Sequence, residues 1–130
     1  MKKILFIIFS LILTSTLFAQ KEAKISWKEL NDFHDLVSPV FHTAEKGNYS
    51  TAKDSSYLLL DRAQKLNAAP LPAGLATATY KPLTERLVLE TKDVDAAVKA
   101  KKTDAELKPL LHKAHNTFHE ILGKFKAEKH

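Results

Sequence analysis

The sequence predicts an all-α domain, an antiparallel up-down-up-down four-helix bundle that follows an N-terminal signal peptide. Three observations support this prediction. Apolar residues recur at helical spacing in four segments of the chain. After residue 19, no run of residues alternates between apolar and polar as a half-buried strand would. The connections expected between the first two segments and between the last two are short, which favours antiparallel neighbours.

Residues 1–19 have the parts of a secretory signal peptide. Lys2 and Lys3 form the positive start, residues 4–17 are mostly apolar, and Ala19 supplies the small residue before the cleavage site. The apolar stretch is shorter than the roughly 20 residues that a membrane-spanning helix needs. We therefore expect residues 20–130 to be exported to the periplasm as one four-helix domain, with no stable membrane insertion after cleavage.

The first two helices are marked by end signals and by an apolar stripe. The first is expected from about Trp27 to Lys46, after a capping-box pattern of Ser26 and Glu29 and before the stop signal Gly47-Asn48. The second is expected over about residues 51–66. The expected inward residues are Leu30, Phe33, Val37, Val40, Phe41 and Ala44 in the first helix, and Ala52, Leu59, Ala63 and Leu66 in the second.

A loop rich in alanine, proline and threonine, residues 67–81, is the longest expected connection. The third helix is expected to open at Pro82, because proline is favoured in the first helical turn, and to reach about Ala100. The fourth is expected from Thr103 to about Lys126, where Thr103 and Glu106 repeat the capping-box pattern. The expected inward residues are Leu83, Leu87, Val94, Ala97 and Val98, and then Leu107, Leu110, Leu111, Ala114, Phe118, Ile121, Leu122 and Phe125.

Composition excludes several kinds of partner and cofactor. The formal net charge is +5, but two of the lysines belong to the signal peptide and the other charges are mixed along the chain. Without a basic patch interleaved with aromatic residues, we expect no nucleic-acid partner. The chain has no cysteine, which excludes disulfides, covalent c-type haem and thiolate metal sites. Its single methionine is Met1, so no residue after the signal peptide offers a thioether.

Histidines are concentrated in the first and fourth predicted helices. Three of them directly follow a phenylalanine, as Phe33-His34, Phe41-His42 and Phe118-His119. Successive helical residues are rotated by about 100°, so each phenylalanine points into the core and the next histidine lies at the edge of the apolar face. If the two helices pack side by side, these edges meet. The candidate metal ligands are His34, His42, Glu45, His112, His115 and His119.

The expected register between these two helices assigns neighbours to the histidines. Aligning the start of the first helix with the end of the fourth makes facing residue numbers sum to about 152. In that register His34 faces the level of Phe118, and His42 faces the level of Leu110.

The core of the predicted metal site is therefore His34, His115 and His119. His42 joins these ligands if a bend at Pro39 brings it closer. Glu45 and His112 are expected as weaker ligands or as hydrogen-bonding partners of the ligands.

Zn(II) or Cu(II) is the expected metal, because imidazole with an optional carboxylate suits both ions. Asn116 stands where a His-Glu-x-x-His zinc protease carries its glutamate, so the sequence offers no general base there and we expect no enzymatic activity. The paired Glu-x-x-His motifs of carboxylate-bridged iron or manganese bundles are absent from the sequence. The predicted function is a non-catalytic metal buffer, scavenger or sensor.

Two alternatives stay open at this point. The first is a bis-histidine haem protein, a b-type cytochrome-like bundle with haem in an apolar slot. The second is a bundle whose surface binds a protein partner and whose histidines are incidental. The residues that would line a haem slot are Phe33, Phe41, Phe118 and Phe125.

The segments Phe33-His34, Phe41–Asn48 (FHTAEKGN) and His115–Glu120 (HNTFHE) resemble a family of small exported, histidine-containing helical-bundle proteins, mostly from Gram-negative bacteria. The resemblance covers the first and fourth helices. In outline the chain is also similar to the cytochrome b562 bundles, but these use a methionine on the first helix that is missing here, so their function does not carry over. The family resemblance implies no activity, and it implies joint action of His34, His42, Glu45, His115 and His119.

Overall fold

The computed structural model describes residues 26–128, which form four helices and contain no strand. The helices are α1 (Lys28–Glu45), α2 (Ser50–Ala68), α3 (Thr77–Lys99) and α4 (Asp104–Glu128). The prediction of an all-α fold with four helices is confirmed. The predicted signal peptide and the first residues after it lie outside the described residues, as does His130. Within residues 26–128, no helix combines the length and the apolar character needed to cross a membrane.

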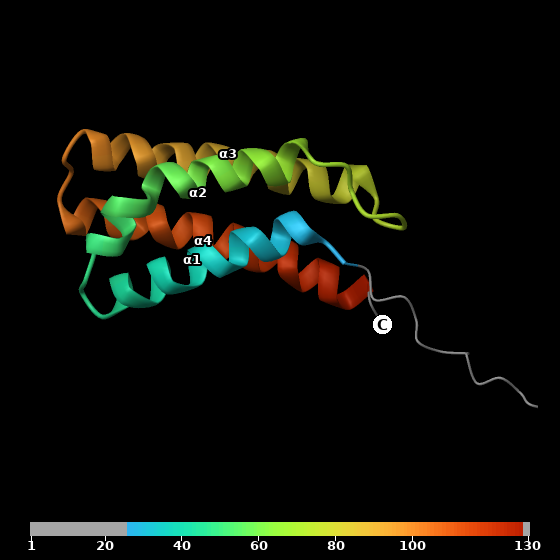
Figure 1. Ribbon diagram of the computed structural model, residues 1–130, viewed down its shortest axis with the longest axis horizontal. Helices are drawn as coiled ribbons and strands as arrows, with labels where there is room; N and C mark the ends of the chain where they lie inside the picture. The colour runs from blue at the N-terminus through green and yellow to red at the C-terminus, as the bar shows by residue number, and fades with distance from the viewer. Residues whose placement is uncertain (1–25, 129–130) are drawn as a thin grey trace, which may run out of the picture.

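The four helices pack in a ring in which each contacts the helices before and after it, and α1 contacts α4 (Figure 1). The α1 and α4 pair makes the least extensive contact of the four. A hydrogen bond or an aromatic contact joins each neighbouring pair. The joining contacts are Arg62 with the Asp32 carbonyl, Ser56 with Asp95, Tyr80 with Glu128, and Trp27 with Phe125.

The core follows the predicted apolar stripes. Every residue of the α1 stripe is buried. On α4 the stripe is also buried, except for Leu110 and Leu122, which are half-buried. At the end of the bundle where α1 begins, the ring of Trp27 makes edge contacts with Tyr80 at 5.4 Å and with Phe125 at 5.8 Å between ring centroids. Three helices are thus held together by aromatic packing at this end.

The predicted start of α3 is wrong by five residues, because the helix begins at Thr77 and contains Pro82. A proline in this position removes one backbone hydrogen bond. Tertiary contacts offset that loss. Tyr80 is fully buried, and its hydroxyl donates a hydrogen bond to Glu128 at 2.7 Å. The turn before Pro82 is therefore held helical by packing that local propensity does not describe.

One predicted capping box is confirmed and the other is wrong. The backbone N–H of Thr103 donates to Glu106 at 2.8 Å, and the N–H of Glu106 donates to the Thr103 hydroxyl at 3.2 Å. At α1 the N-cap residue is Trp27, and no side chain caps the helix. Ser26 is exposed beside it. Burial of the Trp27 ring, which is 1% exposed, determines where α1 begins.

A carboxylate that the sequence did not reveal as buried lies between α2 and α3. Asp95 is 4% exposed, accepts a hydrogen bond from the Ser56 hydroxyl at 2.9 Å and pairs with Lys99 at 2.7 Å. Burial raises the pKa of Asp95, but the hydrogen bonds from Lys99 and Ser56 lower it by more, so the pKa lies below its ordinary value. The carboxylate is therefore charged at neutral pH.

Replacing Asp95 by alanine is expected to destabilise the domain by about 1–3 kcal/mol, because the buried Ser56 hydroxyl loses its acceptor. Asp93→Ala is the matched control, since Asp93 is exposed two residues away on the same helix. The free energy of unfolding of both variants is measured by urea unfolding at pH 7. In the double variant Asp95→Ala/Ser56→Ala, part of the loss should be recovered. Equal urea midpoints for Asp95→Ala and Asp93→Ala would contradict this account.

Candidate metal centre

The candidate site lies along the seam between α1 and α4, which we call the α1–α4 seam and define as residues 34–45 facing residues 108–119. Aromatic contacts fix its register. Phe33 packs on Phe118 at 5.5 Å between ring centroids, and Phe41 contacts His112 at 5.1 Å. With the Trp27–Phe125 contact, these pairs confirm the register predicted from the sequence.

Phe118 connects two of the candidate histidines. The ring of His34 stacks on Phe118 at 5.6 Å with an interplanar angle of 26°. The ring of His119 meets Phe118 edge-on at 5.6 Å. Phe118 is buried, whereas both histidines are exposed. Each imidazole therefore has one side on the core and the other in water.

Phe41 holds the most buried part of the cluster. The ring of His115 lies parallel to Phe41, with centroids 3.5 Å apart and an interplanar angle of 4°. The edge of His112 lies against the same phenylalanine. Both histidines are half-buried. The stack fixes the plane of the His115 ring and leaves its nitrogens at the edge of the seam.

His115 and His119 make direct contact one helical turn apart. Their Nε2 atoms are 3.0 Å apart, and their ring centroids are 4.3 Å apart. A hydrogen bond of this length between two imidazoles needs one protonated and one bare nitrogen. The two Nε2 atoms therefore point toward each other, and the i, i+4 spacing of their residues is the one that chelating pairs of histidines use on a helix.

The pKa of His115 is lowered to about 4, first by burial of the imidazole and next by the positive charge that His119 can carry. His112 and His42 add smaller effects of the same sign, and the Glu45 carboxylate opposes them. His115 is thus neutral at pH 7 and has a lone pair available for a metal ion. The same interactions indicate that Glu45, His42 and His112 lie close to His115.

The candidate ligands on α1 differ in their neighbours. Nδ1 of His42 is 3.6 Å from the carboxylate of Glu45, and both side chains are exposed. Nδ1 of His34 is 3.7 Å from Asp35, and His34 approaches the pair on α4 only through Phe118. Within residues 26–128, the side chains as they stand form no group of three or more histidine, aspartate or glutamate ligands that could hold a metal ion. The structure brings His115 and His119 together and leaves the other candidates around them.

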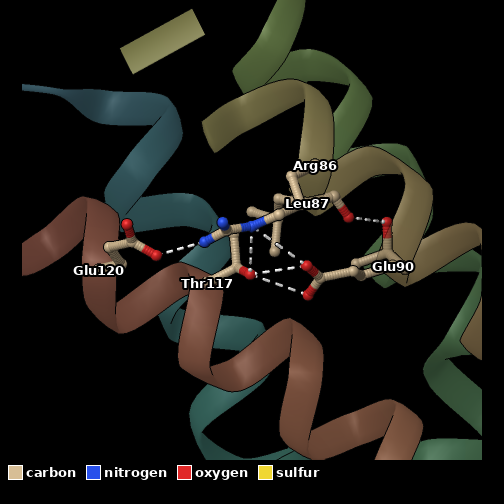
Figure 2. A network of polar contacts seen from close by, with 6 residues as sticks. Arg86, Leu87, Glu90, Thr117 and Glu120 are labelled. Atoms are coloured by element: carbon tan, nitrogen blue, oxygen red, sulfur yellow. Dashed lines mark hydrogen bonds and ion pairs between the residues drawn. The ribbon is translucent and has the colours of Figure 1, made fainter. Parts of the chain in front are cut away.

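The opposite flank of α4 is tied to α3 by a polar network, shown in Figure 2. Thr117 donates a hydrogen bond to Glu90 at 2.7 Å and accepts one from Nε of Arg86 at 3.1 Å. Arg86 also pairs with Glu120. Since Thr117 and Glu120 alternate along α4 with His115 and His119, fixing one flank toward α3 turns the histidine flank toward α1.

The sequence offered a signal for this network that apolar periodicity overlooked. Thr117 is buried and precedes the core residue Phe118, while Glu90 and Arg86 are spaced by four residues on the α3 flank that faces α4. A buried threonine between two histidine positions, opposite an i, i+4 pair of opposite charge, indicates an interhelical hydrogen bond. These residues position the candidate ligands and do not approach the metal position themselves.

Comparisons with protein-family models, curated proteins and solved structures found no match to this chain. The assignment of a function therefore depends on the geometry of the α1–α4 seam. The resemblance to exported histidine-containing bundles stays a prediction.

Acidification is expected to destabilise the domain through His115. Its folded pKa is near 4 and its unfolded pKa is about 6.5, so between these values the unfolded chain binds the extra proton. Stability should fall as pH is lowered from about 6.5 to about 4. Because the ring is only partly buried, solvent screening limits the expected loss to about 1 kcal/mol.

Urea midpoints at pH 7.5 and pH 5 measure this loss. His115→Gln should reduce the difference between the two midpoints, whereas the control His34→Gln, at an exposed position, should leave it unchanged. An NMR titration of the imidazoles gives the direct test. A His115 ring that titrates near pH 6.5 in the folded protein would show that this account of its burial is wrong.

Proposed function

We propose that the chain is an exported, antiparallel up-down-up-down four-helix bundle that binds Zn(II) or Cu(II) at the α1–α4 seam and has no catalytic role. The observation that carries the proposal is the contact between the Nε2 atoms of His115 and His119, which are 3.0 Å apart. The His115 ring of this pair is neutral at pH 7. A metal ion binds both Nε2 atoms only when each neutral ring carries its proton on Nδ1, so the ring that donates the Nε2–H bond first moves that proton to Nδ1 through solvent.

Ligands from α1 complete the coordination. Glu45 is the favoured third ligand, because its carboxylate acts on His115 and its exposed side chain has freedom to turn toward the ion. His42, 3.6 Å from Glu45, and His112, against Phe41, are the next candidates. His34 is a less favoured ligand, because Phe118 separates it from His115. A negative ligand on α1 also makes the ion a bridge between the two helices with the least extensive contact.

The separation of the two nitrogens favours Cu(II) over Zn(II). Two nitrogens about 2.1 Å from one ion and 3.0 Å apart subtend an angle of about 90° at the metal. That angle belongs to the tetragonal geometry of Cu(II). Tetrahedral Zn(II) needs nitrogens roughly 3.4 Å apart, which requires one ring to move outward. Both ions remain compatible with imidazole and carboxylate ligands.

Non-catalytic handling of the ion fits the surroundings of the pair. His119, His42 and Glu45 are exposed, so an ion enters and leaves without opening the core. Asn116 follows His115, so the position that carries the general base in His-Glu-x-x-His enzymes holds an amide. A buffer or scavenger requires reversible capture from solution, and these features support that role.

Haem is less well supported as the ligand. The four phenylalanines proposed to line a haem slot are buried against other rings, with Phe33 on Phe118 at 5.5 Å, Phe41 on His115 at 3.5 Å and Phe125 on Trp27 at 5.8 Å. Insertion of a porphyrin between α1 and α4 requires such contacts to separate. A metal ion at the seam edge requires no such separation.

The test is isothermal titration of tag-free protein with Cu(II) and with Zn(II), supported by elemental analysis. The wild-type chain is expected to bind one ion of either metal, with higher affinity for Cu(II). His115→Ala/His119→Ala should weaken binding by at least about 100-fold while circular dichroism shows unchanged helicity. Glu45→Gln should weaken it by about 10-fold.

His34→Ala is the matched control, because it removes an exposed imidazole from the same seam and should change affinity by less than about threefold. Retained affinity in the double variant rejects the proposed ligands. An equal loss in His34→Ala would transfer the site to the Phe118 end of the seam. A Soret band on addition of haemin, together with failure to bind either ion, would favour the haem protein instead.

A further inference from the structure

Beside the histidine cluster, the α1–α4 seam opens into a cavity of about 280 Å³. It lies where α1 ends and the chain turns into α2, opposite the early part of α4. Phe41 and Leu111 form its apolar floor, and both are buried. Glu45, Lys108 and His112 form its polar rim.

The sequence explains why this space is not filled. In the register of the seam, Ala44 faces Lys108 across the cavity. A methyl side chain opposite an exposed lysine leaves a gap that neither residue occupies. Gly47, with φ of +87°, then reverses the chain, and its N–H bonds to the Ala44 carbonyl at 2.9 Å. The turn forms one end of the cavity, where Gly47 adds no side chain and Tyr49 lines the wall.

The rim carries one negative charge that is paired and one positive charge that is unpaired. The Glu45 carboxylate pairs with His42. Within residues 26–128, the side chain of Lys108 forms no hydrogen bond or ion pair, so its ammonium group is free to hold an anion. The floor is apolar and the free charge is positive. Such a site suits a molecule with an apolar body and one anionic group.

We propose that this cavity binds a small organic acid whose apolar body is about the size of one ring. The ring of this ligand packs on Phe41 and Leu111, and its carboxylate pairs with Lys108. An apolar cavity of about 150 Å³ is enough to hold benzene. The volume of about 280 Å³ therefore has room for one ring and a carboxylate. Larger ligands fit less well, because ordinary drug-sized sites are bigger than this cavity.

The carboxylate site is coupled to the proposed metal site through Glu45, and this coupling rests on the proposed function. In the metal-free protein the Glu45 carboxylate repels an anion at the rim. An ion bound by Glu45 and His115 neutralises that charge, so it raises the affinity for the carboxylate. By linkage, the carboxylate raises the affinity for the metal by the same factor.

Benzoate is the probe, and benzyl alcohol is its uncharged counterpart. In an NMR titration of the metal-free protein, benzoate should shift the amide signals of Ala44 and Leu111. The affinity obtained from these shifts should be higher for benzoate than for benzyl alcohol. Lys108→Gln should weaken benzoate binding by about threefold and remove the preference over the alcohol. Lys113→Gln is the control, since Lys113 is exposed on α4 away from the cavity rim. Ala44→Leu should fill the cavity and abolish binding of both probes.

Glu45→Gln and Zn(II) separate the cavity from the metal proposal. Glu45→Gln should raise the benzoate affinity of the metal-free protein by about threefold. Saturation with Zn(II) should raise the benzoate affinity of the wild type by the same factor and should leave that of Glu45→Gln unchanged. Benzoate binding that responds to Glu45→Gln but not to Zn(II) would support the cavity and overturn the coupling. Equal affinity for both probes, or unchanged binding in Ala44→Leu, would overturn the carboxylate site even if the metal binds as proposed.

Discussion

Packing of the α1 phenylalanines against α4 is the interaction from which the candidate site follows. Phe33 on Phe118 and Phe41 on His115 set the register of the two helices. Because the register is fixed, the imidazoles of His115 and His119 reach the same edge of the seam as Glu45. The stack on Phe41 also removes water from one face of His115, and that partial burial keeps the ring neutral near pH 7. The contact with Phe41 thus influences both where the His115 nitrogens lie and whether this ring is protonated.

The rotation of α4 about its axis is set by its buried apolar stripe and also by the polar network on its far flank. Thr117 shares hydrogen bonds with Glu90 and Arg86, and Arg86 continues to Glu120 (Figure 2). The Glu90 side chain is 14% exposed, so leaving it unpaired carries a desolvation cost. The α3 side of α4 therefore prefers one rotation. The histidine edge is presented to α1 by polar contacts on one side and by apolar contacts on the other.

The apolar pattern was sufficient to predict the four helices, the buried face of α1 and the register of the seam, because each depends on helical periodicity. It failed at Trp27 and Pro82, where burial of the Trp27 and Tyr80 rings overrides local start signals. For the site, the sequence predicted which histidines lie at the edges of α1 and α4. It ranked His34 together with His115 and His119, whereas the contacts between the rings depend on which phenylalanine each imidazole covers. His34 lies on Phe118, whereas His115 lies on Phe41 near Glu45, and that choice is made by rotamers and packing.

The weakest helix pair carries both the histidines and the cavity, and this coincidence has a physical reason. A metal site needs donors that are dry enough to stay neutral and open enough to exchange an ion. Between α2 and α3, by contrast, Asp95 and Ser56 are buried in an internal hydrogen bond. At the α1–α4 seam, small Ala44 faces flexible Lys108 and leaves the packing incomplete. Tighter packing there would add stability and would remove the access that the proposed reversible binding requires.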